Sequence, residues 1–444
     1  MRMNRDLTKG PIMRSMLAFA LPMILGNLLQ QGYNIADTLI VGHFLGTNAL
    51  AAVGSSFTLM TFLTSILLGL CMGSGALFSI RYGQRDEAGL QEAVQASFFL
   101  IAAAAVLLSG IAFISLNALE GFLQVPPDVW PLMRSYLSVI FCGIFATFLY
   151  NYFASLLRAL GNSVIPLVFL AVSALLNIAL DLGFVLILRR GVAGAAEATV
   201  IAQFVSGVGI ALYTWICYPQ LRSGRCRIRL GCVRELAGFS LLTCVQQSVM
   251  NLGILMVQGL VNSFGSTVMA AFAAAVKIDA FAYMPVQDFG NAFSTFIAQN
   301  FGAHKDERIR KGLVGAAAAS ILFCVMVSLL VCIFARPLMA LFVGKDEALV
   351  IAEGVRYLRI EGAFYGGIGC LFLLYGLYRA LKRPGMSVVL TVISLGTRVA
   401  LAYLLSAIPS VGVVGIWWSV PIGWLLADAV GILYYLRRKE QLLP

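Results

Sequence analysis

The sequence predicts an all-α polytopic membrane protein in which twelve transmembrane helices form two six-helix bundles. Three observations predict this fold class. Of the 444 residues, 60% are hydrophobic and 11% are charged, whereas a soluble chain of this length needs many more charged side chains to cover its surface. Apolar segments long enough to cross a bilayer recur along the chain, and its two halves share a sequence pattern. The composition excludes a soluble enzyme, a nucleic-acid-binding protein and a disordered chain.

Twelve apolar segments define the predicted spans in order. Each provides about the 20 residues that a helix needs to cross the hydrocarbon core, and the loops between them are short. Because the number of spans is even, both termini lie on one side of the membrane. The segments cover residues 14–37, 50–79, 93–116, 130–156, 163–188, 192–217, 235–262, 268–299, 313–334, 355–378, 386–406 and 411–436.

The position of the basic residues indicates which side holds the termini. The formal net charge is +11, and most of the 31 Lys and Arg residues lie in the termini and in the loops on the same side as the termini. Cytoplasmic loops of membrane proteins carry such an excess. We therefore expect both termini in the cytoplasm, and we attribute the positive charge to membrane orientation rather than to nucleic-acid binding.

The second half of the chain repeats the pattern of the first half at a nearly constant offset. Leu45–Ala52 corresponds to Phe264–Ala271. With two residues added in the second half, Gly191–Gly194 corresponds to Gly412–Gly415. These matches at both ends of the pattern predict that the two halves share one architecture.

This repeat divides the chain into residues 1–225 and residues 226–444, each with six predicted spans. An even number of spans per half gives both halves the same orientation, so the repeat is parallel. Two like halves that face each other leave a cleft that opens to either side, which is the layout of a transporter. The chain has no G-x-x-x-x-G-K-[ST] nucleotide-binding loop, so we expect an ion gradient or the substrate's own gradient to drive transport.

The first half carries acidic and polar side chains inside its spans, where each of them is costly. Tyr33 and Asp37 stand four residues apart in the first span, and Asn177 and Asp181 do so in the fifth. Each pair therefore shares one face of its helix. Thr199 lies in the sixth span. At the corresponding positions the second half has Met256 for Asp37, Arg398 for Asn177 and Ala402 for Asp181.

Two carboxyl groups with amide, hydroxyl and phenol oxygens nearby form a site for a proton or a small hard cation. We interpret Asp37 and Asp181 as the groups that carry this cation, which is either a proton or, with both acids as metal ligands, Na⁺. The alternative is that both acids only hydrogen-bond polar neighbours at the membrane boundary. Glu197, near the start of the sixth span, either joins this site or faces the outer vestibule.

The second half also carries ionisable side chains in its spans. Lys277 and Asp279 lie two residues apart in the eighth span, so they face different directions and we expect each to find a partner elsewhere. We favour structural pairing for both, with lining of the cleft as the alternative. Structural roles are also our interpretation of Glu361, Arg398 and Asp428.

One face of the eighth span suits a substrate that is bulky and apolar. Met284 and Tyr283 provide adaptable and aromatic surface, and Gln287 and Asp288 provide polar contacts, so we interpret these four residues as lining the substrate cleft. Ordinary helix packing is the alternative for the Met and aromatic side chains. Pro22 leaves a backbone carbonyl unpaired inside the first span and permits a kink there.

Six short motifs are spread from the first span to the loop after the eighth. They are Leu21-Pro22, Tyr33-Asn34-Ile35-Ala36-Asp37-Thr38, Arg158-Ala159-Leu160-Gly161-Asn162 with Pro166, the pair Asn177 and Asp181, Gly191-Val192-Ala193-Gly194-Ala195-Ala196, and Gln299-Asn300-Phe301-Gly302-Ala303. Together they resemble the multidrug and toxic compound extrusion (MATE) transporters, in particular the bacterial DinF-like branch. The resemblance covers essentially the whole chain.

The resemblance implies two six-helix bundles of the MATE/MOP type that form a V. It also implies export of amphipathic, often cationic compounds in exchange for H⁺ or Na⁺. Members of this branch hold a cation-responsive cluster in the N-terminal bundle. The matching positions here are Tyr33, Asp37, Asn177, Asp181 and Thr199, with Asn151 as a further candidate.

The resemblance further implies that protonation of Asp37 bends the first span at Pro22. The sequence departs from the family in two places. Some other members carry acids in the seventh and tenth spans, and we expect none in the corresponding membrane interiors of this chain. Glu197 is a charge where the family leads us to expect a neutral residue.

We therefore expect a monomeric, cation-coupled antiporter that exports small amphipathic or cationic substrates by alternating access across the lipid of the bacterial cytoplasmic membrane. We expect H⁺ or Na⁺ as the coupling ion, no cofactor and no nucleic-acid partner. A flippase for lipid-linked oligosaccharides or other lipids, from the same superfamily, is the alternative; it would need a strongly basic cleft. An intramembrane enzyme is a further alternative, which we reject because His43 and His304 lie near opposite faces and no protease motif is present.

Overall fold

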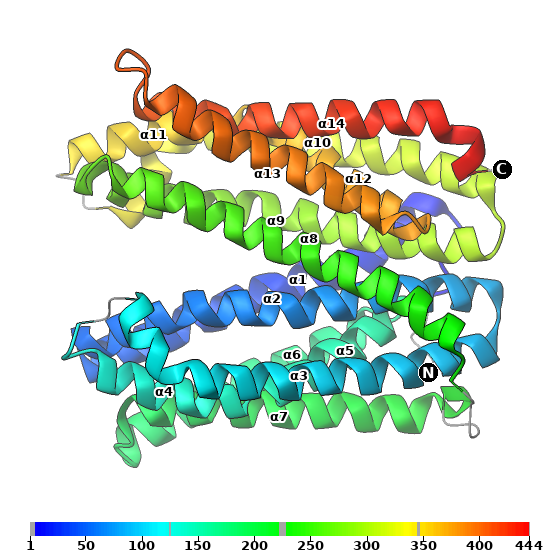
Figure 1. Ribbon diagram of the computed structural model, residues 1–444, viewed down its shortest axis with the longest axis horizontal. Coiled ribbons are helices and arrows are strands. Elements are labelled where there is room, and N and C mark those ends of the chain that lie inside the picture. Colours follow the sequence, from blue (N-terminus) through cyan, green and yellow to red (C-terminus); the bar gives the residue numbers. More distant parts are fainter. Residues whose placement is uncertain (1–4, 124–125, 222–227, 344–346, 444) are drawn as a thin grey trace. The chain divides into compact units, whose positions relative to one another are not determined.

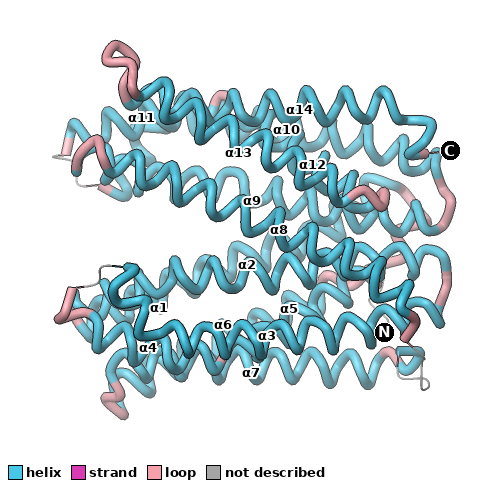
Figure 2. Tube along the Cα trace, viewed as in Figure 1, coloured by secondary structure: helices cyan, strands magenta, loops and turns pink. Residues whose placement is uncertain are grey.

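The computed structural model describes residues 5–123, 126–221, 228–343 and 347–443. Within these ranges all regular secondary structure is helical (Figure 2). This confirms the predicted all-α class. The predicted boundary between residues 225 and 226 lies outside the described residues.

The first half of the chain forms long helices that are broken twice (Figure 1). One break, at Gly143, separates α4 from α5, and the other is a π-helical segment, η1, that continues α6. The elements are α1 (Ile12–Leu45), α2 (Thr47–Gln84), α3 (Glu87–Leu123), α4 (Trp130–Cys142), α5 (Ile144–Ala159), α6 (Val164–Asp181), η1 (Leu182–Ile187), α7 (Gly191–Cys217) and the 3-10 helix η2 (Pro219–Leu221).

The second half follows the same order of long and broken helices. Its break between α11 and α12 stands at Ala363–Phe364, which corresponds to the break at Gly143 in the first half. The elements are α8 (Leu230–Asn262), α9 (Ser266–Gly302), α10 (Asp306–Phe342), α11 (Ala348–Gly362), α12 (Tyr365–Ala380), α13 (Pro384–Ser406) and α14 (Val413–Leu442).

These helices account for the predicted membrane spans. Among the described residues, 10 helices are long and apolar enough to cross a membrane, and the count is 12 if each of two bent pairs forms one span. The pair α4 and α5 bends by 45°, and the pair α11 and α12 bends by 50°. The twelve predicted segments therefore correspond to ten single helices and two bent ones.

The two halves also share their unusual backbone conformations. A φ in the left-handed region suits Gly and is uncommon for other residues, so its recurrence at matching positions is informative. It marks the ends of corresponding helices in both halves and confirms the parallel internal repeat. The pairs are Gly46 and Gly265, Arg85 and His304, Gly161 and Lys382, and Gly191 and Gly412.

The chain forms two compact units whose bounds differ from the halves predicted by the repeat. Unit 1 comprises residues 1–6 and Leu25–Cys244, and unit 2 comprises Leu7–Ile24 and residues 245–444. The start of α1 thus belongs to unit 2, and the start of α8 belongs to unit 1. The division at 225 and 226 describes the sequence repeat, whereas the units follow which parts of the backbone pack together.

Specific hydrogen bonds explain both exchanges. In unit 2, Asn300 Nδ2 donates to the carbonyl oxygen of Leu7 at 3.2 Å, and Arg308 Nη2 donates to that of Lys9 at 2.8 Å. In unit 1, Arg229 Nη2 donates to Glu92 Oε2 at 2.6 Å, immediately before α8 begins. Each crossing helix is therefore anchored at its start to the unit that holds the other half of the chain.

Pro22 lies inside α1, close to the point where this helix passes from unit 2 to unit 1. Its ring removes one backbone hydrogen bond, so the helix is weaker there than elsewhere. The helix nevertheless runs without a break from Ile12 to Leu45. The predicted kink stays a prediction.

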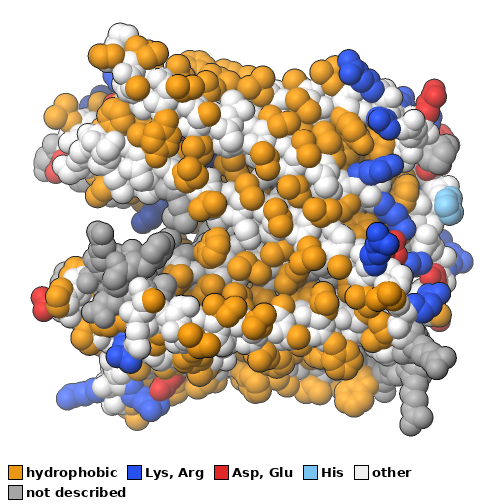
Figure 3. Space-filling view, viewed as in Figure 1, with side chains coloured by type: hydrophobic (Ala, Val, Ile, Leu, Met, Phe, Trp, Pro, Cys, Tyr) orange, Lys and Arg blue, Asp and Glu red, His pale blue; other side chains and the backbone are white. Residues whose placement is uncertain are grey.

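The outer surface of each unit is apolar. Large hydrophobic side chains such as Ile114, Leu322 and Leu39 are 86%, 73% and 65% exposed. A protein in water rarely exposes an apolar surface that extends over so many helices. Hydrophobic side chains cover the helices in the space-filling view, and in unit 2 Lys and Arg side chains gather toward the end that holds the C-terminus (Figure 3). This chain is a multi-pass membrane protein.

Candidate functional site

Four polar side chains of unit 1 come from two helices and lie on two helix faces. Tyr33 and Asp37 stand one turn apart near the end of α1, and Asn177 and Asp181 stand one turn apart at the end of α6. The spacing of four residues places each pair on a single face. All four lie in the part of the chain that packs as unit 1.

The structure brings the two acids together. The carboxyl groups of Asp37 and Asp181 interact directly, and Tyr33 and Tyr136 lie within electrostatic reach of this pair. Asp181 is completely buried. The predicted pairing of the α1 acid with the α6 acid is therefore present in the folded chain, and Tyr136 on α4 is a neighbour that sequence reasoning missed.

The carboxyl oxygens of this pair lack donors. Among the described residues, both carboxyl oxygens of Asp181, Oδ1 of Asp37 and Oδ1 of Asn177 are buried without a hydrogen-bond partner. Buried oxygens without donors cost free energy, roughly 1–3 kcal/mol each for neutral groups and more for charged ones. These oxygens remain free to accept a hydrogen bond or to bind a cation.

Thr199 connects α7 to the same cluster. Asn177 Nδ2 donates to Thr199 Oγ1 at 3.3 Å, and Thr199 Oγ1 donates to the carbonyl oxygen of Ala195 at 3.1 Å. This chain of hydrogen bonds uses the amide nitrogen of Asn177 and leaves its Oδ1 as an acceptor. Carboxyl, amide and hydroxyl oxygens are the ligands that a hard cation prefers, and the same groups can form a proton relay.

The surroundings of the pair contain apolar side chains and no cationic partner. A buried cluster that includes Val41, Tyr136, Ile140 and Val185 packs around this end of unit 1. In the part of the chain that the structure describes, the ion pairs of unit 1 join other acids, and no Lys or Arg pairs with Asp37 or Asp181.

Two further candidates have partners elsewhere. Arg190 Nη1 donates to Glu197 Oε2 at 2.5 Å, and this ion pair gives Glu197 a structural role at the start of α7. Asn151 Nδ2 donates to the carbonyl oxygen of Thr147 on its own helix at 2.8 Å. Neither contact joins these residues to the acid pair.

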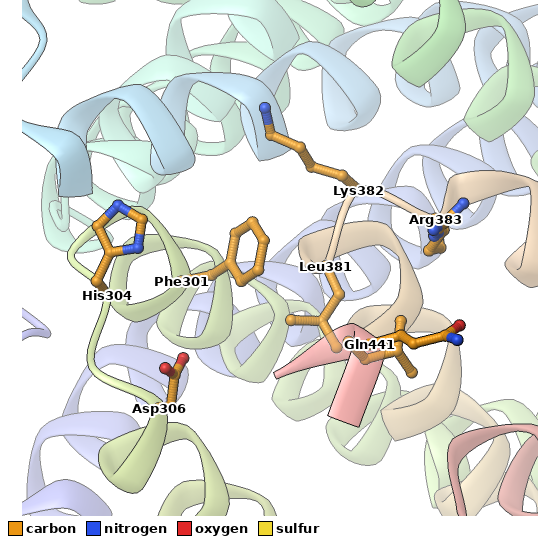
Figure 4. A pocket seen from close by; sticks show the side chains of 8 residues that line it. Phe301, His304, Asp306, Leu381, Lys382, Arg383 and Gln441 are labelled. Atoms are coloured by element: carbon orange, nitrogen blue, oxygen red, sulfur yellow. The ribbon is translucent and has the colours of Figure 1, made fainter. Parts of the chain in front are cut away.

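The residues expected to line a substrate cleft all lie on α9 in unit 2. Met284 and Asp288 are buried, and Tyr283 and Gln287 are half-buried. Their role as cleft lining stays a prediction. A cavity of about 310 Å³ lies at one end of unit 2, between Phe301, His304 and Asp306 on one side and Leu381 and Gln441 on the other (Figure 4). Residues of the acid pair and of the predicted cleft do not line it.

Unit 2 holds a second buried acid pair that the sequence did not lead us to expect. Asp279 on α9 and Glu361 on α11 are 5% and 1% exposed and interact directly. Glu361 lies on the first part of the bent tenth span, and the expectation that this span carries no acid in the membrane interior stays a prediction. Asp279 does find its partners on another helix, as predicted.

Two tyrosines bind this second pair. Tyr357 hydroxyl donates to Glu361 Oε2 at 2.7 Å and lies 3.4 Å from Asp279 Oδ2. Tyr365 hydroxyl donates to Asp279 Oδ1 at 2.5 Å. Arg398 on α13 acts electrostatically on both acids. The sequence did contain a signal for this site, because Tyr357 and Glu361 stand four residues apart and Tyr357 corresponds to Tyr136.

Comparisons with known proteins agree with the fold. The MatE family model matches residues 22–182 and 241–404. The probable multidrug resistance protein YpnP of Bacillus subtilis is 28% identical, over 97% of this chain and 96% of that protein. A protein of Shewanella oneidensis named FAD transporter is 26% identical, over 99% of this chain and 97% of that protein.

Solved structures show the same fold. An outward-facing multidrug resistance MATE family transporter of the MOP superfamily matches with a TM-score of 0.92 at 22% identity, over 99% of this chain and 98% of that one. A MOP superfamily transporter from Pyrococcus furiosus matches with a TM-score of 0.91 at 22% identity, with the same coverage of both chains.

Proposed function

Because this chain belongs to the MatE family, whose members are transporters, we propose that it is a cation-coupled multidrug exporter that works by antiport. One observation carries the proposal. Asp37, which is half-buried, and Asp181, which is completely buried, form an acid pair without a cationic partner among the described residues. Relatives named as multidrug resistance proteins support the class of cargo.

The acid pair couples the cation to the drug through linkage. A cation bound between Asp37 and Asp181 stabilises the conformation in which their oxygens converge, and substrate stabilises a different conformation. When two ligands favour different states of one molecule, a gradient of one drives the other uphill. Either H⁺ or Na⁺ fits this scheme, because the same oxygens of the pair, of Asn177 and of Thr199 bind both.

The proposal includes the place and cargo of the transporter. We place it as a monomer in the bacterial cytoplasmic membrane with both termini in the cytoplasm, in line with the excess of Lys and Arg at the ends of the helices near the termini. The cargo is amphipathic and often cationic, and α9 contributes Tyr283, Met284, Gln287 and Asp288 to the surface that binds it.

Reconstituted vesicles test the proposal. Purified protein in liposomes is given a cationic dye and then a pH gradient or a Na⁺ gradient, one at a time, with the unmodified chain beside Asp37→Asn and Asp181→Asn. We expect either substitution to abolish gradient-driven dye transport while dye binding, measured by fluorescence polarisation, is retained. Glu197→Gln is the matched control, because it removes an acid of the same unit that already has an ion-pair partner.

Normal gradient-driven transport by both Asn variants would show that the acid pair is structural. Product formed from lipid or peptide in the same vesicles would instead favour an intramembrane enzyme. Because one relative is named a FAD transporter, the same vesicles are also tested with FAD, and transport of FAD without dye transport would overturn the proposed cargo.

A further inference from the structure

The two acid pairs differ in whether an arginine stands on the neighbouring helix. Both consist of carboxyls from two different helices, and both have a tyrosine of the fourth or tenth span beside them, Tyr136 in unit 1 and Tyr357 in unit 2. Asp181, Asp279 and Glu361 are buried, and Asp37 is half-buried. In unit 2, however, α13 adds Arg398, at the position that corresponds to Asn177 of unit 1.

Arg398 has a buried hydrogen-bond donor and Glu361 a buried acceptor, and no other described residue pairs with either atom. Among the described residues, Glu361 Oε1 is a buried acceptor without a hydrogen-bond partner, and Arg398 Nε is a buried donor without one. Among the described residues Arg398 makes no ion pair with either acid, and its charge reaches Glu361 and Asp279 over a longer distance. A guanidinium keeps its charge at any physiological pH, so it is a counter-charge that the pair cannot release.

The remaining groups around the pair are tyrosines and aromatic rings. Tyr357, Tyr365 and Tyr283 are the titratable neighbours that act on Asp279 and Glu361 together with Arg398. Trp417 and Phe272 stack on each other and pack against Tyr357, at ring centroid distances of 4.9 and 5.5 Å from it. This wall closes the pair off from external ions on that side.

We propose that Arg398 is a built-in cation for the Asp279–Glu361 pair, so that unit 2 keeps its charge balance fixed while unit 1 alone exchanges the coupling cation. With two adjacent carboxyls and one guanidinium, a single proton shared between the acids makes the cluster neutral. Unit 1 has Asn177 where unit 2 has Arg398, so an ion from solution must supply the charge there. The statement that unit 1 alone exchanges the coupling cation rests on the proposed function, whereas the charge balance in unit 2 does not.

Charge-compensating variants in detergent and in vesicles test it. Arg398→Gln leaves a net negative charge in the buried cluster, and we expect a fall of several degrees in the melting temperature and a loss of about tenfold or more in gradient-driven dye transport. The double variant Arg398→Gln with Glu361→Gln removes one charge of each sign, and we expect it to recover most of both losses. Arg398→Lys keeps the charge and should stay close to the unmodified chain.

The coupling ratio, which is the number of cations exchanged for each dye molecule, separates a charge-balance role of Arg398 from a merely structural one. It is measured as the opposing dye gradient that just stops cation-driven transport. We expect the double variant to keep the ratio of the unmodified protein. A ratio lower by one cation would show that Glu361 carries an exchanged cation, and equal damage in the single and double variants would show that Arg398 does not balance Glu361. Both results would overturn the proposal.

The two proposals fail in different ways. If the unmodified protein shows no cation-driven transport, the proposed function is wrong, and the melting temperatures of the single and double variants still decide whether Arg398 balances the acid pair. If transport is normal and Arg398→Gln changes neither the melting temperature nor the transport rate, the proposed function stands and the built-in cation does not.

Discussion

Units 1 and 2 share a backbone plan but differ in where they place buried charge. The tyrosine of the bent span is present in both, as Tyr136 and Tyr357, yet the acids around it come from α1 and α6 in unit 1 and from α9 and α11 in unit 2. At the position of Glu361, unit 1 has Ile140, which belongs to an apolar cluster. The same framework can therefore hold two acid pairs of different chemistry.

Burial of two acids does not by itself make them a site for the coupling cation. Asp279 and Glu361 accept hydrogen bonds from two tyrosines and lie near a guanidinium, whereas Asp37 and Asp181 have buried oxygens without donors. In the unit 2 pair only Glu361 Oε1 lacks a donor among the described residues, whereas in the unit 1 pair Asp37 Oδ1 and both carboxyl oxygens of Asp181 do. The unit 1 pair therefore has more free energy to gain from an added ion. Variants that exchange these properties test this distinction.

The largest effect should come from giving unit 1 the arginine of unit 2. Asn177→Arg places a permanent positive charge beside Asp37 and Asp181, where it competes with the coupling cation. We expect gradient-driven dye transport to fall by a factor of about 100 or more, which corresponds to roughly 3 kcal/mol. Vesicle uptake measures it, and Asn177→Gln, which adds length without charge, is the control. Uptake equal to that of Asn177→Gln would contradict the distinction between the units.

A smaller effect is expected from removing the tyrosine hydroxyls one at a time. Tyr357→Phe deletes the donor to Glu361 Oε2 at 2.7 Å and leaves a buried carboxyl oxygen unpaired, so it should destabilise the protein by about 1–3 kcal/mol. Tyr136→Phe should cost less stability, because Tyr136 acts on its acids through electrostatics. Thermal unfolding in detergent compares the two. A larger loss for Tyr136→Phe would show that unit 1 depends on its tyrosine more than its contacts indicate.

The anchors of the crossing helices should show an intermediate loss of stability. Glu92 is buried and accepts from the backbone N–H and the side chain of Arg229 at 2.6 Å, so Glu92→Gln should destabilise unit 1 by about 1–2 kcal/mol. Arg308 in unit 2 binds backbone carbonyls instead. The loss of stability caused by Arg308→Gln should therefore depend less on added salt than the loss caused by Glu92→Gln. Unfolding at low and high ionic strength checks both. Equal salt dependence would indicate that the two anchors work alike.

The smallest effect is expected at the Arg190–Glu197 ion pair. Arg190 is 53% exposed, and exposed pairs contribute roughly 0–1 kcal/mol. Arg190→Gln should leave both the melting temperature and cation-driven transport within error of the unmodified chain. A clear loss of transport without a loss of stability would bring Glu197 back into the coupling site.

The sequence predicted the fold class because the signals for it are local. Apolar length defines the spans, and matching residues such as Gly46 and Gly265 reveal the repeat. It also predicted the unit 1 pair, since a spacing of four residues places Tyr33 on the same helix face as Asp37, and Asn177 on the same helix face as Asp181. These predictions need only one helix at a time.

The parts that could not be predicted depend on contacts between helices. Sequence reasoning assigned Glu361 a structural role without a named partner, and only the packing of α11 on α9 shows that it meets Asp279. Likewise, Leu7–Ile24 has the same apolar character whichever unit it joins. Its place in unit 2 follows from hydrogen bonds such as that from Asn300.

The exchange of helix starts between the units limits how the chain can be cut into pieces. A fragment of residues 1–225 would lack the beginning of α8 that unit 1 needs, and a fragment of residues 226–444 would lack Leu7–Ile24, which unit 2 needs. Neither half is a complete folding module when synthesised alone. Co-expression of both fragments in one cell should therefore yield active transporter, whereas separate expression and later mixing should not.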